Sequence, residues 1–306
     1  MDVLKAEIHC HNQYSNSHLG DLEPYHDCNV TVPQQIEQCY KLGLDVLFVT
    51  NHNTLDGYFE SIEYRENHEH LKNLKIYPAE EVTADTGAHI LVYGISETIK
   101  PGLTVNEILD EVKSQGAVSS AAHPFEIFNG IRNNAILCDM IEVFNSNSID
   151  KFSNVRAKQF GDKHQMIQVA GSDSHILSTL GRCVNLVESE NNLDAILYAM
   201  KKANIRIEKT RYITDTELME HISYKVANSK EFINNYFSQI YPNAHKLLTL
   251  LYSMFESNPN SQLWKVFFKI AKRALNRISY KVNFKDYDPS ILYDRNLTTM
   301  LKMALF

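Results

Sequence analysis

Two closely spaced histidines, His9 and His11, end the first apolar, β-rich run of the chain. Alternate residues of a strand point to the same face, so this spacing presents two imidazoles together. Asp173 and His175 repeat the spacing after a later apolar run. Imidazoles and carboxylates gathered at strand ends are a ligand set for Zn, Mn or Fe, and ions held in this way activate water for hydrolysis. The pattern therefore predicts a metalloenzyme.

Further candidate ligands lie between the two pairs, and most of them follow short apolar runs. They are His18, His52, Glu81, His89 and His123. A lone histidine in an apolar run is more often a hydrogen-bonded core residue, but the pairs and the shared strand-end position favour a metal site. Two or three ions close together need a bridging carboxylate, which Glu81 or Asp173 can provide and a neutral histidine cannot. We therefore interpret Glu81 and Asp173 as catalytic residues as well as ligands.

Other polar residues near these motifs receive structural interpretations. Cys10 should point away from its flanking histidines and behave as a small buried apolar residue. Asn145 is expected to support the mouth of the site, with Glu142 either functional or structural. The histidines expected at the surface are His26, His68, His70, His164, His221 and His245.

Arg182 follows the last ligand pair and is the leading candidate for binding a substrate phosphate. Its planar guanidinium can form two parallel hydrogen bonds with phosphate oxygens. The alternative interpretation is a salt bridge at the rim of the fold. Arg132 and Lys151 are weaker candidates for the same role.

Residues 1–212 alternate short strands with amphipathic helices, which is typical of an α/β fold. Two capping boxes, Thr31 with Gln34 and Thr104 with Glu107, mark helix starts. Parallel strands place functional residues at their carboxyl ends, and a closed barrel gathers those ends around one mouth, so a barrel is the better interpretation. The predicted strands are 6–10, 45–50, one from 75, 89–94, 117–122, 140–144, 166–170 and 184–187, with further helices at 151–163 and 193–203.

The sequence changes character at about residue 213, which we take as a domain boundary. Residues 213–306 contain no glycine and carry helical spacing. They hold 12 Lys and Arg against 8 Asp and Glu, whereas residues 1–212 hold 18 against 29, which indicates two units with different neighbours. The basic amphipathic stretch 264–277 could lie on a membrane or on nucleic acid, but packing on its own domain is the commoner outcome. The region, with helices at 217–227, 230–240, 243–255 and 262–282, is expected to dock on the barrel, cap the site or form a homo-oligomer.

Length and composition fit one large α/β domain with a smaller partner. The 306 residues are 44% hydrophobic and 22% charged, as in an ordinary globular protein. Five cysteines without a C-x-x-C pair favour reduced thiols and a cytoplasmic location. The amino-terminal sequence lacks the apolar stretch of a secretory leader, and no run approaches the roughly 18 apolar residues of a membrane span.

Taken in order, these motifs resemble the PHP superfamily, named for polymerase and histidinol phosphatase domains. The resemblance covers about residues 1–212 and depends on HCHNQYS (9–15), VTNHNT (49–54), AEEVT (79–83), HIL (89–91), AHP (122–124) and GSDSH (171–175). It implies a distorted (β/α)7 barrel with two or three divalent metal ions. The metal ligands that it implies are His9, His11, His18, His52, Glu81, His89, His123, Asp173 and His175.

The chain departs from the family pattern in two places. Asn51 stands where the T-D-H motif has aspartate, a position expected to orient ligands rather than bind the metal. Asn16 stands where some members carry aspartate, which leaves that assignment to His18. On the motif, Glu81 is the ligand and its neighbour Glu80 is expected to be solvated.

The favoured function is hydrolysis of a small-molecule phosphomonoester, with a metal-bound hydroxide attacking phosphorus while Arg182 and the ions bind the phosphate. A nuclease or cyclic phosphodiesterase, with the basic helical region holding nucleic acid, is an alternative that the acidity of residues 1–212 disfavours. A metal-stabilised scaffold without catalysis is a third interpretation, disfavoured by the near-complete ligand set. Zn, Mn and Fe all accept mixed nitrogen and oxygen ligands, so the sequence does not select the metal.

Overall fold

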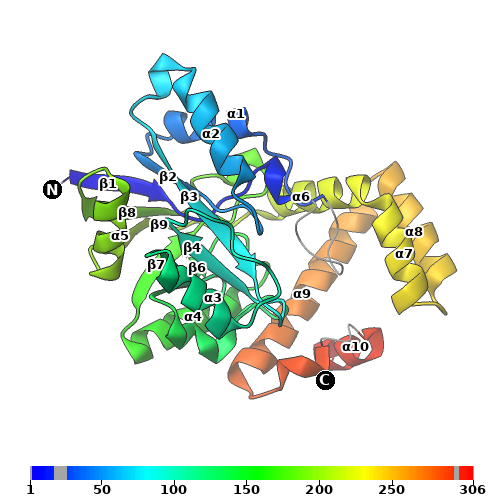
Figure 1. Ribbon diagram of the computed structural model, residues 1–306. Coiled ribbons are helices and arrows are strands. Elements are labelled where there is room, and N and C mark those ends of the chain that lie inside the picture. Colours follow the sequence, from blue (N-terminus) through cyan, green and yellow to red (C-terminus); the bar gives the residue numbers. More distant parts are fainter. Residues whose placement is uncertain (1, 17–25, 293–295, 306) are drawn as a thin grey trace.

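Nine strands form one sheet that curls into a nearly closed barrel (Figure 1). The computed structural model describes residues 2–16, 26–292 and 296–305. Within these residues the strand order is β7-β6-β5-β4-β3-β2-β1-β8-β9. The strands are β1 (Asp2–Glu7), β2 (Val46–Val49), β3 (Lys75–Thr83), β4 (His89–Tyr93), β5 (Val118–Ala121), β6 (Met140–Asn145), β7 (Ile167–Gly171), β8 (Val184–Ser189) and β9 (Ile205–Lys209). The predicted α/β barrel is confirmed, and β9 is an additional strand that the sequence analysis does not predict.

The sheet mixes parallel and antiparallel pairs. The neighbours β1–β2, β2–β3, β5–β6 and β6–β7 run parallel, as the alternation of strands and helices predicts. In contrast, β4 is antiparallel to β3 and β5, and β8 is antiparallel to β1 and β9. The link from Thr83 to His89 is too short for the crossover that a parallel pair requires, so β3 turns directly into β4. This reversal places Glu81 and His89 on adjacent strands.

Side-chain hydrogen bonds join β7 and β8, which are not neighbours in the strand order. Asn185 on β8 donates from Nδ2 to the carbonyl of Ala170 (2.7 Å) and accepts from the amide of Ala170 (3.0 Å). Nearby, the buried carboxylate of Glu7 accepts hydrogen bonds from Ser172 Oγ (2.5 Å) and from the amide of Gly181 (3.0 Å). The ends of β1, β7 and β8 are therefore held together where the candidate ligands begin.

Five helices pack around these strands (Figure 1). They are α1 (Val32–Lys41), α2 (Asp56–Glu66), α3 (Val105–Ser114), α4 (Lys151–His164) and α5 (Leu193–Lys201). Both predicted capping boxes are confirmed, because the Thr31 and Thr104 side chains accept from the amides of Gln34 and Glu107, which bond back to the capping residues. These local signals fix the starts of α1 and α3, and burial of their apolar faces fixes their orientation.

The described part of residues 213–306 is mainly helical, as predicted, and docks on the barrel. Its helices are α6 (Asp215–Asn228), α7 (Lys230–Ile240), α8 (His245–Ser257), α9 (Gln262–Phe284) and α10 (Leu297–Leu305). Helix α9 lies against α4, where Ser279 donates to Asp150 Oδ1 (2.5 Å) and Asn283 Nδ2 donates to the carbonyl of Phe125 (3.2 Å). The domain boundary near residue 213 falls in the link between β9 and α6 and stays a prediction. No helix among the described residues is long and apolar enough to cross a membrane.

Glu80 on β3 is buried, so the expectation that it is solvated is wrong. Its side chain is fully covered, and Oε1 accepts a hydrogen bond from the amide of Ile99 (2.6 Å). Burial raises the pKa of Glu80 to about 8, because desolvation disfavours the carboxylate. Neighbouring residues of a strand point to opposite faces, so Glu80 points away from the face that carries Glu81. The segment around Ile99 covers the Glu80 side chain.

We expect Glu80→Gln to flatten the pH dependence of stability. The folded-state pKa of Glu80 lies above the ordinary value of 4.5, so its contribution is greatest below pH 4.5 and is lost as the pH rises through about 8. The wild-type free energy of unfolding should therefore fall by ~2 kcal/mol more than that of the variant between pH 6 and pH 9. Urea unfolding at both pH values measures this, and equal changes in the two proteins would contradict it.

Candidate metal centre

The two sequence pairs meet because their backbones pair at the barrel mouth. The amide of His11 donates to the carbonyl of Ser174 (3.1 Å), and the amide of Asp173 donates to the carbonyl of His9 (2.7 Å). The strands' carboxyl ends are thereby placed side by side, as expected for a barrel. His9 and His11 are fully buried, and Asp173 and His175 are nearly so.

Glu81 lies at the centre of the cluster. A short bridge to the His52 segment holds its backbone, since the amide of Glu81 donates to the carbonyl of Asn51 (3.0 Å). Its carboxylate oxygens contact His9 Nε2 (3.4 Å), His11 Nε2 (3.2 Å), His52 Nδ1 (3.2 Å), His89 Nδ1 (3.0 Å) and His123 Nε2 (3.0 Å). Burial alone would raise the pKa of Glu81, but these histidines hold it well below its usual range.

Asp173 forms a second contact point for the imidazoles. Its Oδ1 lies 3.2 Å from His11 Nε2, 3.4 Å from His9 Nε2 and 3.5 Å from His175 Nδ1. Asp173 has a φ of 47° and His123 a φ of 26°, a backbone region that costs energy for residues other than glycine. The surrounding contacts must offset this strain, which is common at functional sites.

The donor atoms form three overlapping groups, each compact enough for one ion. They are His9, His11, Glu81 and Asp173; His52, Glu81 and His89; and His11, His52 and His175, with donor atoms within 4.8 Å of one another in each group. Glu81, His11 and His52 each belong to two groups. The two carboxylate oxygens of Glu81 can serve two neighbouring ions, whereas His11 and His52 can each bind only one ion at a time.

Unsatisfied donor atoms provide the test of whether a divalent ion fits. Buried atoms without a hydrogen-bond partner among the described residues include His9 Nε2, His11 Nε2, His52 Nδ1, His89 Nδ1 and Glu81 Oε2. Buried polar atoms of this kind are costly unless paired, and all face the same cluster. Burial also lowers the pKa of His52 to about 4, which keeps its imidazole neutral and able to bind a cation. The residues therefore fit Zn, Mn or Fe.

Asp27 joins the cluster, although the sequence analysis does not identify it. Its Oδ2 lies 2.6 Å from His175 Nε2 and 3.5 Å from His52 Nε2, and its side chain is buried. Although burial opposes ionisation, His175 and Lys225 hold the pKa of Asp27 well below its usual range. The predicted ligand His18 lies outside the described residues. The sequence signal that could have identified Asp27 is an acidic residue after the H-x-H motif. The number of residues between the motif and such a ligand cannot be deduced from the spacing of the motif itself.

Helix α6 brings two further residues to the site, and the prediction that His221 is a surface residue is wrong. His221 is buried, its Nε2 lies 2.8 Å from the carbonyl of Asp27, and its ring stacks on His175 with centroids 4.8 Å apart. Lys225 Nζ donates to Asp27 Oδ1 (2.5 Å). Both residues line the cavity of the metal centre, about 130 Å³, together with Asp27, His52, Glu81, His89, His123, Glu126, Asn129, Asn147, Asp173 and His175.

Arg182 does not line this cavity. It forms an ion pair with Glu217 on α6, and its Nε donates to the carbonyl of Ser178 (3.4 Å). Of the two interpretations offered for Arg182, the salt bridge at the rim of the fold describes this arrangement. The phosphate-binding role is not supported, because Arg182 is not among the residues that line the cavity. The weaker candidates Arg132 and Lys151 also do not line it. Among the described lining residues, the lysine or arginine that faces the site is Lys225.

Glu142 and Asn145 on β6 orient the ligands. Glu142 Oε1 lies 2.8 Å from His9 Nδ1, and Oε2 accepts from the amide of His123 (2.7 Å) and from Asn145 Nδ2 (3.0 Å). Asn145 Nδ2 also donates to Asp173 Oδ2 (3.1 Å). A carboxylate at His9 Nδ1 directs the Nε2 lone pair toward the metal centre. These contacts agree with the supporting role expected of Asn145.

Asn51, the departure from the family motif, holds the loop that carries His11. Its Oδ1 accepts from the amide of Asn12 (2.9 Å) and from Ser15 Oγ (3.0 Å). Ser15 Oγ lies 2.9 Å from His11 Nδ1. An amide thus still performs the orienting role predicted for this position.

We expect Glu142→Gln to weaken metal binding about 10- to 100-fold. Three donors converge on the two carboxylate oxygens, whereas glutamine offers one oxygen and an NH₂ group that would face a donor. Metal retained after dialysis against graded chelator concentrations measures the change. Asp139→Asn is the control, since Asp139 accepts from Ser119 outside the cluster. Equal retention by both variants would contradict the orienting role.

An α/β barrel that gathers buried imidazoles and carboxylates at its mouth is suited to hold metal ions that activate water. A family model described as PHP-associated matches residues 151–205, which contain Asp173 and His175. Because the match is confined to residues 151–205, it shows that this segment is similar to the PHP-associated family.

Individual proteins and solved structures are also similar to this chain. The chain is 30% identical to the uncharacterized protein MJ0417 of Methanocaldococcus jannaschii over 114 residues, 34% of this chain and about half (48%) of that protein. Its fold is similar to a two-domain protein from Bacteroides vulgatus containing a predicted PHP-like metal-dependent phosphoesterase (TM-score 0.54, 17% identity, 74% of this chain and 70% of that one). It is also similar to the lesion-specific endonuclease PfuEndoQ from Pyrococcus furiosus (TM-score 0.50, 18% identity, 67% and 58%). At these identities the structures establish the fold alone.

Proposed function

We propose that the chain hydrolyses a phosphomonoester of a small molecule at a site for two or three divalent ions. The observation that carries this proposal is the set of three overlapping donor groups, two of which share the carboxylate of Glu81. Zn, Mn or Fe bound there would activate water near neutral pH and neutralise charge that develops on the phosphoryl group. The proposed ligands are His9, His11, Asp27, His52, Glu81, His89, His123, Asp173 and His175, with His18 remaining a sequence-based prediction.

The residues around the ligands suggest how the substrate is bound. Lys225 replaces Arg182 as the proposed phosphate-binding cation, because it lines the cavity and Arg182 does not. Glu126 lies at the other side, where its Oε2 is 3.5 Å from His123 Nδ1. Burial raises the pKa of Glu126 above its usual value.

A phosphoester panel with metal-loaded protein tests the proposal. The purified chain is loaded separately with Zn, Mn and Fe(II), its metal content is measured by elemental mass spectrometry, and release of inorganic phosphate is followed. We expect two to three ions per chain and turnover of at least one phosphomonoester that a chelator abolishes. Full loading without turnover of any phosphoester would instead favour the scaffold interpretation.

The nuclease alternative predicts a different result. Binding to single-stranded DNA that weakens steeply with salt would support it. The homo-oligomer and the cytoplasmic location also stay predictions. An oligomer would use the exposed apolar residues of the helical region as its interface. Analytical ultracentrifugation would measure the mass of the particle in solution. These residues are Leu247, Leu250, Met254, Leu263, Val266, Phe267 and Ile270.

A further inference from the structure

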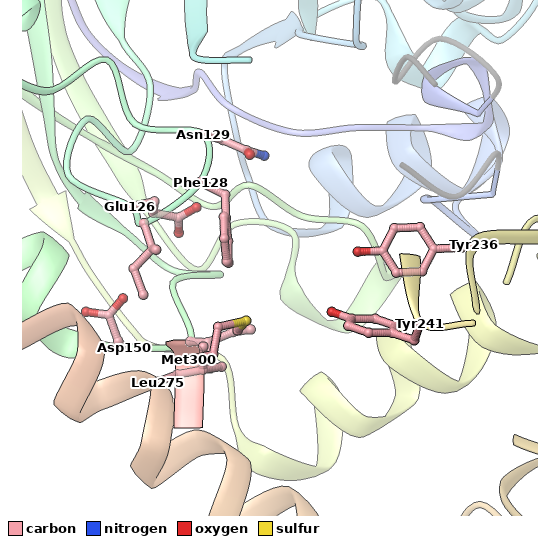
Figure 2. A pocket seen from close by; sticks show the side chains of 10 residues that line it. Glu126, Phe128, Asn129, Asp150, Tyr236, Tyr241, Leu275 and Met300 are labelled. Atoms are coloured by element: carbon pink, nitrogen blue, oxygen red, sulfur yellow. The ribbon is translucent and has the colours of Figure 1, made fainter. Parts of the chain in front are cut away.

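A second cavity lies between residues 126–129 of the barrel and the helical region (Figure 2). We call it the aromatic cavity; its polar and aromatic lining residues are Glu126, Phe128, Asn129, Asp150, Tyr236 and Tyr241. Its volume is about 420 Å³, the size of a small-molecule site. Glu126 and Asn129 line both this cavity and that of the metal centre, so the two spaces meet at the 126–129 loop.

We propose that the aromatic cavity binds the leaving group of the substrate, and that the substrate is a nucleoside monophosphate. The inference rests on the proposed phosphoester hydrolysis and adds the substrate class. The phosphate would lie beside Lys225 in the metal centre, and the ring would lie beyond Glu126 and Asn129. The sugar hydroxyls would then face the carboxylate and amide of these two shared residues.

The first argument is the aromatic lining. Phe128 enters the cavity from the barrel loop, and Tyr236 and Tyr241 face it from α7 and the residue after α7 (Figure 2). The two tyrosine rings meet at 67° with centroids 6.1 Å apart, so they are not stacked face to face on each other. Aromatic side chains around a space of this size are suited to stacking on a planar ring such as a nucleobase.

The second argument is charge. Two of the residues that line the aromatic cavity, Glu126 and Asp150, are acidic, and none of its described lining residues is lysine or arginine. A leaving group with a further phosphate would meet these carboxylates without a compensating cation. Hydroxyl and amino groups, in contrast, are the donors that carboxylates accept. The lining therefore favours one nucleoside over a nucleic-acid strand or a bisphosphate.

A matched pair of substrates isolates the ring. AMP and ribose 5-phosphate share the same phosphate ester, and only AMP carries a base. With metal-loaded protein we expect kcat/KM about 10-fold or more higher for AMP, mainly through a lower KM, and we expect Phe128→Leu and Tyr241→Leu each to lower this preference about 10-fold. Phe59→Leu, at an exposed position on α2, is the control and should leave both substrates unchanged.

Binding provides a second readout that needs no turnover. Adenosine, titrated by calorimetry into the metal-free protein, should bind, and Phe128→Leu should weaken that binding about 10-fold. Equal turnover of AMP and ribose 5-phosphate would overturn the inference and leave phosphoester hydrolysis intact. A preference for adenosine 3′,5′-bisphosphate over AMP would overturn the exclusion of a second phosphate. If no phosphoester is hydrolysed, the proposed function fails, and adenosine binding alone decides whether the cavity accepts a nucleoside.

Discussion

Glu81→Gln should abolish metal loading and lower phosphoester turnover by on the order of 10³-fold or more. Its carboxylate contacts five imidazoles at 3.0–3.4 Å and belongs to two of the three donor groups. A glutamine of the same size cannot supply the negative charge or the second acceptor oxygen that shared ligation requires. The measurement is metal content by elemental mass spectrometry, together with kcat on the best phosphomonoester.

Glu80→Gln is the matched control for this prediction. It makes the same chemical change one residue earlier on β3, where the side chain bonds the amide of Ile99 instead of the histidines. We expect this control to keep its metal content and its turnover at neutral pH. If Glu81→Gln retained both as well, the donor cluster could not be the catalytic site, whatever its geometry.

Removing the metal should lower the thermal unfolding midpoint by roughly 5–10 °C, if the ions are present at about 100 times their dissociation constants. Ions would bind only the folded cluster, and without them the buried donor atoms of His9, His11, His52 and His89 lack hydrogen-bond partners. The loss should be reversed when Zn, Mn or Fe is restored. Differential scanning calorimetry of chelated and reloaded protein measures it.

The Glu81→Gln protein is the control for the effect of metal removal. Since this variant is expected to bind no metal, its midpoint should not respond to chelator or to added ions. A wild-type midpoint that is also unresponsive would mean that the cluster is satisfied by protons alone. His123 would then be protonated in the functional protein. The Glu126 and Glu81 carboxylates outweigh its burial and raise the pKa of His123 to about 10.

The sequence by itself predicts most of the candidate ligands and the elements that carry them. His9 with His11, and Asp173 with His175, are readable because alternation along an extended chain fixes which side chains share a face. The starts of α1 and α3 are readable because a capping box is a contact between residues three apart. Eight of the nine predicted ligands come together in the described residues, namely His9, His11, His52, Glu81, His89, His123, Asp173 and His175.

Tertiary structure alone decides which other polar residues reach the site. Asp27 arrives through a loop whose path no local spacing encodes, and His221 and Lys225 arrive because α6 docks one particular face on the barrel mouth. The same docking pairs Arg182 with Glu217 and leaves it out of the lining of the metal-centre cavity, while packing around Ile99 buries Glu80. Periodicity shows which residues share a helix face or a strand face. Which neighbour covers that face depends on contacts between segments far apart in the chain, and no local pattern records them.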